Sequence, residues 1–172
     1  MNYFLLIIFI VSLDQLSKFL IKYFLSSSGS INIIGSFLKF TYIENSGIAF
    51  GIDTSQYHIY ITVLTIIAIL LIIYYYINLT AENLYEQIPL SFIIAGAIGN
   101  AIDRVLVLIP CANYRGVVDF IDMPNLLYYI GIMNNPRWFI FNIADTSITI
   151  GIILYFISQY KFVKSDESSR NI

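Results

Sequence analysis

Four long apolar stretches constrain the fold of this chain more than any other feature. They cover residues 3–24, 59–77, 88–108 and 139–160, and each is close to the roughly 20 apolar residues that a helix needs to cross a bilayer. Charged residues make up only 12% of the chain, whereas soluble domains average about 25%. The sequence therefore predicts an all-α membrane protein with four transmembrane helices in a single domain over residues 1–172.

The charges around these stretches predict how the chain crosses the membrane. No Lys or Arg precedes the first stretch, and Asp14 and Lys18 interrupt it, so we expect it to be kept as a span rather than removed as a signal peptide. The densest positive cluster near the end of any stretch consists of Lys161, Lys164 and Arg170. Because Lys and Arg are enriched in cytoplasmic flanks, we expect both termini in the cytoplasm and residues 26–58 and 109–138 outside.

The two outer segments contain short signals of β structure. Residues 31–34 and 37–43 are rich in aromatic and β-branched side chains and are separated by Gly35 and Ser36, which predicts a small hairpin on the membrane face. Residues 44–47 carry turn residues, and residues 48–51 are expected to lead back towards the bilayer. A further strand is predicted over residues 115–120 of the second segment.

Two other segments are expected to lie outside the bilayer core. Residues 123–138 are apolar and aromatic, with breaks at Pro124 and Pro136, so we expect this stretch to lie in the membrane interface rather than to cross the bilayer. Trp138 beside Arg137 is a typical interfacial anchor at the start of the fourth span. The polar residues 164–172 predict a disordered tail.

Polar side chains interrupt three of the four spans at a similar depth. Asp14 and Lys18 are four residues apart, and Asn142 and Asp145 are three apart, so each pair shares a helix face. A stripe on the third span carries Gly96, Asn100, Asp103 and Arg104. A charge in a membrane span costs at least about 2.5–3.5 kcal/mol, and such charges face the bundle interior and pair. The expected directions of the spans place all three groups near the outer surface, which predicts one polar pocket there.

When the expected ion pairs in this pocket are assigned, one acid has no basic partner. We expect Asp14 and Lys18 to form a structural ion pair, and Asp103 to pair with Arg104 or to cap a backbone. No basic residue within a span then remains for Asp145, whose burial requires a raised pKa or a second acid. Asp119 in the outer segment is the best candidate for that second acid.

Two facing carboxylates that share one proton can hydrolyse a peptide bond. The ionised acid takes a proton from water, and the protonated acid polarises the carbonyl. This chemistry needs no metal and no organic cofactor, and we expect none. The chain offers a single histidine and a single cysteine, His58 and Cys111, which makes a histidine-rich metal site or a Ser–His triad a poor interpretation. The net charge of -2 gives no indication of a nucleic-acid partner.

Five sequence blocks, in order along the chain, resemble the lipoprotein signal peptidases, also called signal peptidase II. They read D-Q-x-x-K at 14–18, N-S-G-I-A-F-G at 45–51, G-A-I-G-N-A-I-D-R at 96–104, V-V-D-F at 117–120 and F-N-I-A-D at 141–145. The resemblance implies a four-helix aspartyl endopeptidase of the bacterial inner or cytoplasmic membrane. Members of this family remove the signal peptide of prolipoproteins just before a lipid-modified cysteine.

The resemblance also implies roles for individual residues. Asp119 and Asp145 match the catalytic pair. The residues that would orient the substrate or the two acids are Asn45, Gly47, Asn100, Arg104 and Asn142. Supporting structural roles fall on Asp14, Lys18 and Asp103. The implied partners are prolipoproteins that carry a diacylglyceryl-modified cysteine, together with membrane lipids, and we expect the protein to be a monomer.

The chain departs from the family pattern in the lengths of two connections. The segments from Arg104 to Asp119 and from Asp119 to Asp145 are longer than is usual, with the extra residues around 106–114 and 122–136. This leaves the shape of the outer lid open and makes Asp122 an alternative to Asp119. We prefer Asp119, because Met123 and Pro124 after Asp122 mark the exit of a strand.

Two other functions remain as alternatives. Polar groups at matched depth in several spans also occur in proton-coupled transporters and channels. The inner halves of spans two to four are apolar, however, and a path through the membrane would need polar groups there. The third interpretation is a catalytically inactive relative that only binds lipoproteins. The presence of both acids argues against it.

Overall fold

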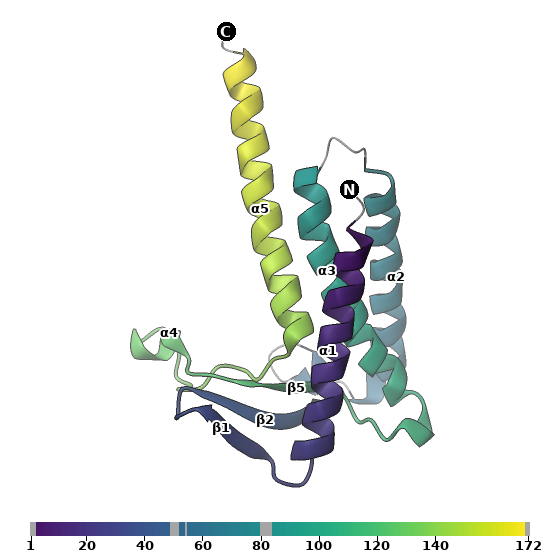
Figure 1. Cartoon of the computed structure of the whole chain (residues 1–172), viewed down its shortest axis with the longest axis vertical. Helices are drawn as coiled ribbons and strands as arrows, with labels where there is room; N and C mark the ends of the chain where they lie inside the picture. The colour runs from purple at the N-terminus through teal and green to yellow at the C-terminus, as the bar shows by residue number, and fades with distance from the viewer. Residues whose placement is uncertain (1–2, 49–51, 54, 80–83, 171–172) are drawn as a thin grey trace.

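The computed structural model describes residues 3–48, 52–53, 55–79 and 84–170. Its four long helices are α1 (Phe4–Leu25), α2 (His58–Ile77), α3 (Leu84–Val107) and α5 (Ile143–Arg170). Each contains a stretch long and apolar enough to span a membrane, which confirms the prediction of four spans. Helices α1, α2 and α3 lie side by side, while α5 packs on α3 at one end of the bundle and leans away at the other (Figure 1).

The buried residues of α1 show how the spans pack. They recur every three or four residues along one face, as expected for a helix with one side towards its neighbours. This face consists of Ile7, Ile10, Asp14, Lys18, Ile21 and Leu25. By contrast, the only buried residues of α2 are Thr62 and Ile69. Helix α2 therefore presents most of its apolar surface outward, as a lipid-facing helix does.

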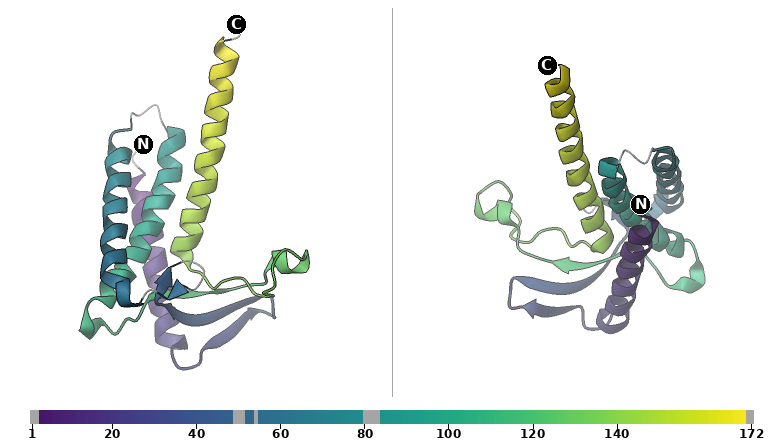
Figure 2. Two further views of the ribbon diagram at one scale, coloured as in Figure 1. Left: turned by 180° about the vertical axis from the view of Figure 1, so that it is seen from behind. Right: turned by 45° about the horizontal axis from the view of Figure 1, so that its top comes forward.

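A three-stranded antiparallel sheet lies across one end of the bundle, which we call the sheet end (Figures 1 and 2). Its strands are β1 (Ser30–Ile34), β2 (Leu38–Asn45) and β5 (Val117–Asp122), in the order β1-β2-β5. The β1–β2 hairpin turns at Gly35, whose φ of 49° suits a glycine. Both the predicted hairpin and the predicted strand of the second segment are confirmed.

The sheet is fixed to the helices through β5. Val118 and Phe120 pack with Ile21 and Leu25 at the end of α1 in one apolar cluster. In the register between β2 and β5, Ile43 lies opposite Asp119. Because one strand of the sheet is packed on the first span, the sheet holds Asp119 at a defined height above the bundle.

The start of the fourth helix differs from the prediction. We expected a span from residue 139, but α5 begins at Ile143. Phe141 instead forms a β-bridge with Ile121 of β5, and its carbonyl oxygen accepts the N–H groups of Phe120 and Ile121. Hydropathy alone does not mark this junction, because Phe139, Ile140 and Phe141 before it are apolar, and the strand contact of Phe141 keeps these residues out of the helix.

Two further helix bounds also differ. Helix α3 begins at Leu84 rather than at residue 88. Helix α5 continues to Arg170, whereas a disordered tail was expected from residue 164. Adding a residue to an existing helix costs far less than starting a new one, so a polar end can extend a span as helix.

The remaining elements are short. Strand β3 (Gly47–Ile48) pairs with β4 (Ile52–Asp53), and the turn expected over residues 44–47 is reduced to a break at Ser46 between β2 and β3. Residues 49–51, expected to lead back to the bilayer, lie outside the described residues. The other elements are η2 (Ser55–Tyr57), η3 (Pro110–Ala112) and α4 (Leu126–Tyr129).

Candidate active site

Strand β5 carries Asp119 to the junction between the sheet and the helices. The residue is only 4% exposed. Both of its carboxylate oxygens accept hydrogen bonds from amide side chains. The Nδ2 of Asn142 lies 2.7 Å from Oδ1, and the Nδ2 of Asn45 lies 3.0 Å from Oδ2. Asp119 is thus held from two sides, by β2 and by the residue that precedes α5.

The start of α5 positions Asp145. Asn142 precedes the helix, and its Oδ1 accepts the backbone N–H of Asp145 at 2.9 Å, while Oδ2 of Asp145 accepts the backbone N–H of Asn142 at 3.2 Å. This reciprocal pattern is a capping box. The Nδ2 of Asn100 on α3 donates to Oδ1 of Asp145 at 2.7 Å. The spacing of three residues in F-N-I-A-D therefore reflects a helix cap, not only a shared helix face.

Asn142 connects the two acids. Its side-chain NH₂ group donates to Asp119, and its oxygen and backbone N–H hold Asp145. The same NH₂ group also lies 3.1 Å from Oδ1 of Asn100. Asn142 is fully buried, so no water competes for these contacts. The structure brings together the two acids and three of the amide residues expected around them.

The surroundings of Asp119 disfavour its charged form. Burial raises its pKa, and the nearby charge of Asp145 raises it further, to about 7. The hydrogen bonds from Asn45 and Asn142 and the charge of Lys18 act in the opposite direction. Since an ordinary aspartate has a pKa of 3.8, this carboxyl group keeps its proton at a pH where exposed aspartates have lost theirs.

A second polar cluster lies beneath the two acids. The Nζ of Lys18 is 2.9 Å from Asp14 and 3.1 Å from Asp103, and all three side chains are almost completely buried. Lys18 also donates to Oδ1 of Asn100 at 3.1 Å. The ion pair expected between Asp14 and Lys18 is therefore present, and it is joined by a second acid.

The acids of this cluster hold the backbone next to Asp119 and Asp145. Oδ1 of Asp14 accepts the backbone N–H of Ala144 at 2.8 Å. Oδ2 of Asp103 accepts the backbone N–H of Val118 at 3.0 Å. Each buried acid thus holds the residue immediately before one of the two acids of the site. The expected supporting role of Asp14, Lys18 and Asp103 has a direct geometric form.

The expected partner of Asp103 was partly wrong. Asp103 caps a backbone N–H, as one of the two options had it, but its ion pair is with Lys18. Arg104 makes no ion pair with Asp103 among the residues that the structure describes. Arg104 lies within electrostatic reach of Asp145, Asp103 and Asp119. Asp145 therefore has a basic side chain in its surroundings, contrary to the expectation.

Asp122, the alternative second acid, has other partners. Its Oδ1 forms an ion pair with Arg137 at 2.7 Å, and its Oδ2 accepts the hydroxyl of Thr41 at 3.1 Å. Asp122 is the last residue of β5, where the strand was expected to end.

Gly47 is paired with Asp53 in the small β3–β4 ladder, and its expected role in binding stays a prediction.

Sequence reasoning missed three residues that shape the site. The Nε2 of Gln15 donates to the backbone oxygen of Gly99 at 3.0 Å and lies near both Asp14 and Asp103. A Cβ at Gly99 would come within 2.6 Å of Asp14, and one at Gly116 would collide with the backbone of Asn45. Gln15 and Gly99 lie within the sequence blocks quoted above, and Gly116 directly precedes V-V-D-F. Their places in or beside these blocks are the sequence signal that could have identified them.

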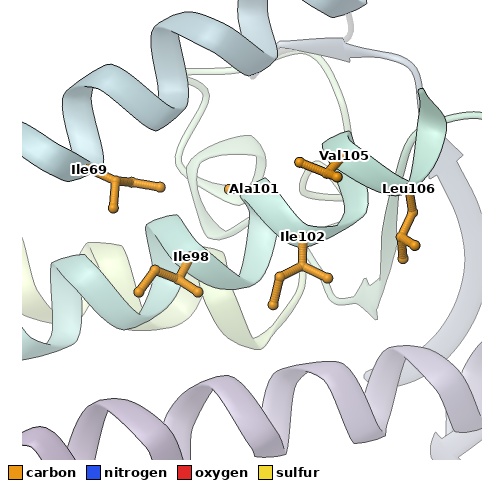
Figure 3. Close-up of a pocket in the computed structure, with 6 residues that line it drawn as sticks. All are labelled: Ile69, Ile98, Ala101, Ile102, Val105 and Leu106. Carbon is orange, nitrogen blue, oxygen red and sulfur yellow. The ribbon is translucent and has the colours of Figure 1, made fainter. Parts of the chain in front are cut away.

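A cavity of about 260 Å³ lies between α2 and α3 (Figure 3). Its walls are formed by the apolar side chains of Ile69, Ile98, Ala101, Ile102, Val105 and Leu106. None of these side chains can donate or accept a proton, so the polar junction at β5 and α5 remains the candidate active site. Within the described residues, no group of three or more His, Cys, Asp or Glu side chains is placed to hold a metal ion.

Fold and site define a multi-pass membrane protein with a pair of carboxylic acids, one buried and one half-buried, at one end of its bundle. The family model for Signal peptidase (SPase) II matches residues 6–161. The chain therefore belongs to the signal peptidase II family, which confirms the resemblance seen in the five sequence blocks. Membership of this family makes the protein a peptidase.

Curated relatives and solved structures agree with this assignment. A lipoprotein signal peptidase of Staphylococcus aureus (strain bovine RF122 / ET3-1) is 38% identical over 157 residues, which cover 91% of this chain and 86% of the relative. A bacterial membrane enzyme solved by the in meso method at 2.3 Å resolution is 36% identical, with a TM-score of 0.73 over 94% of this chain and 88% of the other. A second such structure, at 1.9 Å, has a TM-score of 0.72 at 37% identity and covers 90% of both chains.

Proposed function

We propose that this protein is a membrane aspartyl endopeptidase that removes signal peptides from prolipoproteins. The bond that is hydrolysed lies just before the diacylglyceryl-modified cysteine. Membership of the signal peptidase II family supports the substrate class. The observation that carries the mechanism is that one residue, Asn142, holds both acids: its side chain donates to the carboxylate of Asp119, and its backbone N–H donates to the carboxylate of Asp145.

In the proposed reaction, Asp145 is the ionised acid and Asp119 is the protonated one. Asp119 keeps its proton near neutral pH because its pKa is raised to about 7. Asp145 takes a proton from a water molecule as the water oxygen attacks the scissile carbonyl, and Asp119 donates a hydrogen bond to the carbonyl oxygen. The tetrahedral intermediate then collapses, and the proton that Asp145 took from water passes to the departing cysteine nitrogen.

The amide side chains hold the two acids in fixed positions during this reaction. Asn142 and Asn45 hold Asp119, and Asn100 holds Asp145. Such fixed geometry lowers the barrier, because the reacting groups need no rearrangement when the substrate arrives. In this proposal Arg104, which is attracted by the charge of Asp145, binds a backbone carbonyl of the substrate, and Gly47 contributes to substrate binding.

The proposal includes the orientation of the protein. The sheet end faces the extracytoplasmic side of the bacterial cell membrane, and both termini lie in the cytoplasm, in agreement with Lys161, Lys164 and Arg170 near the C-terminus. Substrate enters sideways from the bilayer as its lipid stays among the membrane lipids. The enzyme works as a monomer.

The deciding experiment is cleavage of a diacylglyceryl-modified prolipoprotein by the purified protein in detergent. Asp119→Asn and Asp145→Asn should each reduce the rate by at least roughly a thousandfold, because each removes a proton-transfer group. Asp122→Asn is the matched control on the same strand and should cleave at nearly the normal rate.

Three outcomes would count against the proposal. Normal cleavage by Asp119→Asn together with loss of activity in Asp122→Asn would replace Asp119 by Asp122. Activity that survives both Asp119→Asn and Asp145→Asn would remove the two-acid mechanism. Cleavage of an unlipidated substrate at an equal rate would remove the dependence on the diacylglyceryl group.

A further inference from the structure

The connection between β5 and α5 folds into a small ordered lobe, residues 123–138, which we call the α4 lobe. Its base is closed by a β-bridge between Pro124 and Arg137 and by the backbone N–H of Trp138, which donates to the oxygen of Met123 at 2.9 Å. Inside it, the side chain of Asn125 is 1% exposed. That side chain accepts the backbone N–H of Leu127 and donates to the oxygen of Asn135. The lobe therefore has its own internal hydrogen bonds.

The outer surface of this lobe is apolar. The exposed fractions are 41% for Tyr128, 69% for Tyr129, 66% for Ile130 and 67% for Ile132. Residues 123–136 include no Asp, Glu, Lys or Arg. A soluble surface rarely gathers large apolar side chains without an intervening charge. Tyrosines beside aliphatic residues are typical of the boundary between headgroups and acyl chains.

The position of the lobe shows what covers this surface. Seen from both sides, α4 lies on the same side of the sheet as the spans, at about the height of the first turn of α5 and well to one side of it (Figures 1 and 2). Because α5 contains a stretch long and apolar enough to span a membrane, we expect a lipid leaflet around it at that height. Trp138 and Phe139, which connect the lobe to α5, are 37% and 38% exposed and continue the apolar surface towards the span.

We propose that the α4 lobe inserts its tip into the leaflet at the sheet end and sets the height of β5 above the membrane. The link to β5 is Arg137. Its Nη2 pairs with Asp122 at 2.7 Å, and its Nη1 donates to the backbone oxygen of Ser36 in the hairpin turn at 2.9 Å. Arg137 thus joins the lobe to the hairpin and to the end of β5, and Asp119 lies three residues from that link.

The contact with lipid is tested by the depth of tryptophan probes. The chain has one tryptophan, so Trp138→Phe provides a background for Ile132→Trp at the tip of the lobe. Two matched probes complete the set. Leu64→Trp places a tryptophan on the exposed face of α2, and Ser28→Trp places one in the exposed turn after α1. Each variant is placed in phosphatidylcholine bilayers that carry bromine at a shallow or a deep acyl position.

Ile132→Trp should be quenched by shallow bromine at least about twofold more strongly than Ser28→Trp, since an interfacial side chain is buried about 5–10 Å into the leaflet. Leu64→Trp should be quenched by bromine as a positive control. The proposal is overturned if Ile132→Trp is quenched no more than Ser28→Trp while Leu64→Trp is quenched strongly.

The consequence for catalysis rests on the proposed function and needs a separate measurement. A variant with Tyr129→Ser, Ile130→Ser and Ile132→Ser removes the apolar tip at positions that are exposed, and it leaves the hydrogen bonds inside the lobe unchanged. Cleavage by this variant should fall several-fold in bilayers and stay nearly normal in detergent. An equal rate in both would remove the role in setting the height of β5. Loss of cleavage by the unmodified protein in detergent would instead contradict the proposed function, without changing the quenching result.

Discussion

Whether Asp119 holds a proton depends on two opposing sets of contacts around its carboxyl group. Burial and the charge of Asp145 favour the neutral carboxyl group, while two amide donors and Lys18 favour the carboxylate. Burial and the neighbouring acid prevail, so the pKa is raised to about 7. The two opposing sets of contacts can be changed one side chain at a time, which makes their effects measurable.

Asp119 should make the folded protein less stable as the pH rises. Its pKa in the folded state, about 7, is higher than the value of 3.8 expected without its surroundings. Between these values the folded state binds more protons than the unfolded state. The free energy of unfolding therefore falls with rising pH, by up to about 1.4 kcal/mol for each unit of pKa difference. Thermal unfolding midpoints in detergent should decline between pH 4 and pH 7 in the unmodified protein and stay flatter in Asp119→Asn.

The comparison of Asp119→Asn with the unmodified protein isolates Asp119 from the other titratable groups of the chain. Asp122→Asn, on the same strand, should keep the decline of the unmodified protein. A parallel decline in Asp119→Asn and the unmodified protein would show that Asp119 does not hold its proton more tightly in the folded state.

Asn45→Ala should move the alkaline limb of the cleavage profile to higher pH. The hydrogen bond from Asn45 lowers the pKa of Asp119, so its removal lets the neutral form persist further. Thr41→Ala is the matched control on β2, because the Thr41 hydroxyl contacts Asp122 instead. The measurement is the pH dependence of kcat/KM for both variants. A limb that shifts to lower pH, or shifts equally in both, would contradict the assignment of that limb to Asp119.

At the scale of residues, the sequence predicts the members of the site better than their pairing. Spacing along the helices correctly grouped Asp14 with Lys18, but it assigned Arg104 to Asp103. Consecutive residues on a helix do not face each other, and Asp103 pairs with Lys18 of α1 instead. The hydrogen bond from Asn45 to Asp119 joins residues 74 positions apart, and no local pattern predicts such a contact.

At the scale of elements, hydropathy predicts which stretches span but not where they stop. Residues 139–141 are as apolar as the helix that follows, and yet Phe141 pairs with Ile121 of β5, and the cap formed by Asn142 marks the start of α5. The hairpin was predictable, since its turn and both strands are local. The pairing of β2 with β5 depends on a long connection through α2 and α3, and it brings Asp119 next to β2.

Removing Lys18 should destabilise the bundle far more than removing Lys22. Lys18→Met leaves Asp14 and Asp103 buried without their cation, a loss on the order of 3 kcal/mol or more. Lys22, four residues later on α1, pairs with Glu44 at a site where its side chain is 20% exposed. Lys22 also lies 3.5 Å from the centre of the Tyr114 ring, but its surroundings are partly open to solvent, so Lys22→Met should cost less than Lys18→Met, on the order of 1–2 kcal/mol. Thermal unfolding in detergent compares the two, and equal losses would mean that the buried cluster contributes no special stability.

At the scale of the whole molecule, the bundle has two distinct ends. The start of α1 and the end of α5 lie at one end, and the sheet, the α4 lobe and both acids lie at the other (Figure 1). An even number of spans requires this arrangement of the termini, so it was predictable. Which end faces the cell exterior depends on the Lys and Arg bias alone, and the structure of the chain does not add to it.

Cys111 should report that orientation directly. It is the single cysteine, it is exposed in η3, and η3 follows α3 at the sheet end. A membrane-impermeant maleimide should label it in intact spheroplasts. In Cys111→Ser with Asn78→Cys, at the opposite end of α2, labelling should require permeabilised membranes. The reverse pattern would invert the proposed topology.

The buried cluster also bears on how the chain is made. Synthesis delivers the first span to the bilayer before α3 and α5 exist, so Asp14 and Lys18 must enter lipid without Asp103, Asn100 or the start of α5. Because the two lie one turn apart on α1 and form an ion pair with each other, the first span is inserted carrying no net charge in its middle. The later helices then assemble around a salt bridge that is already present, and the peptidase site is the last part of the molecule to be completed.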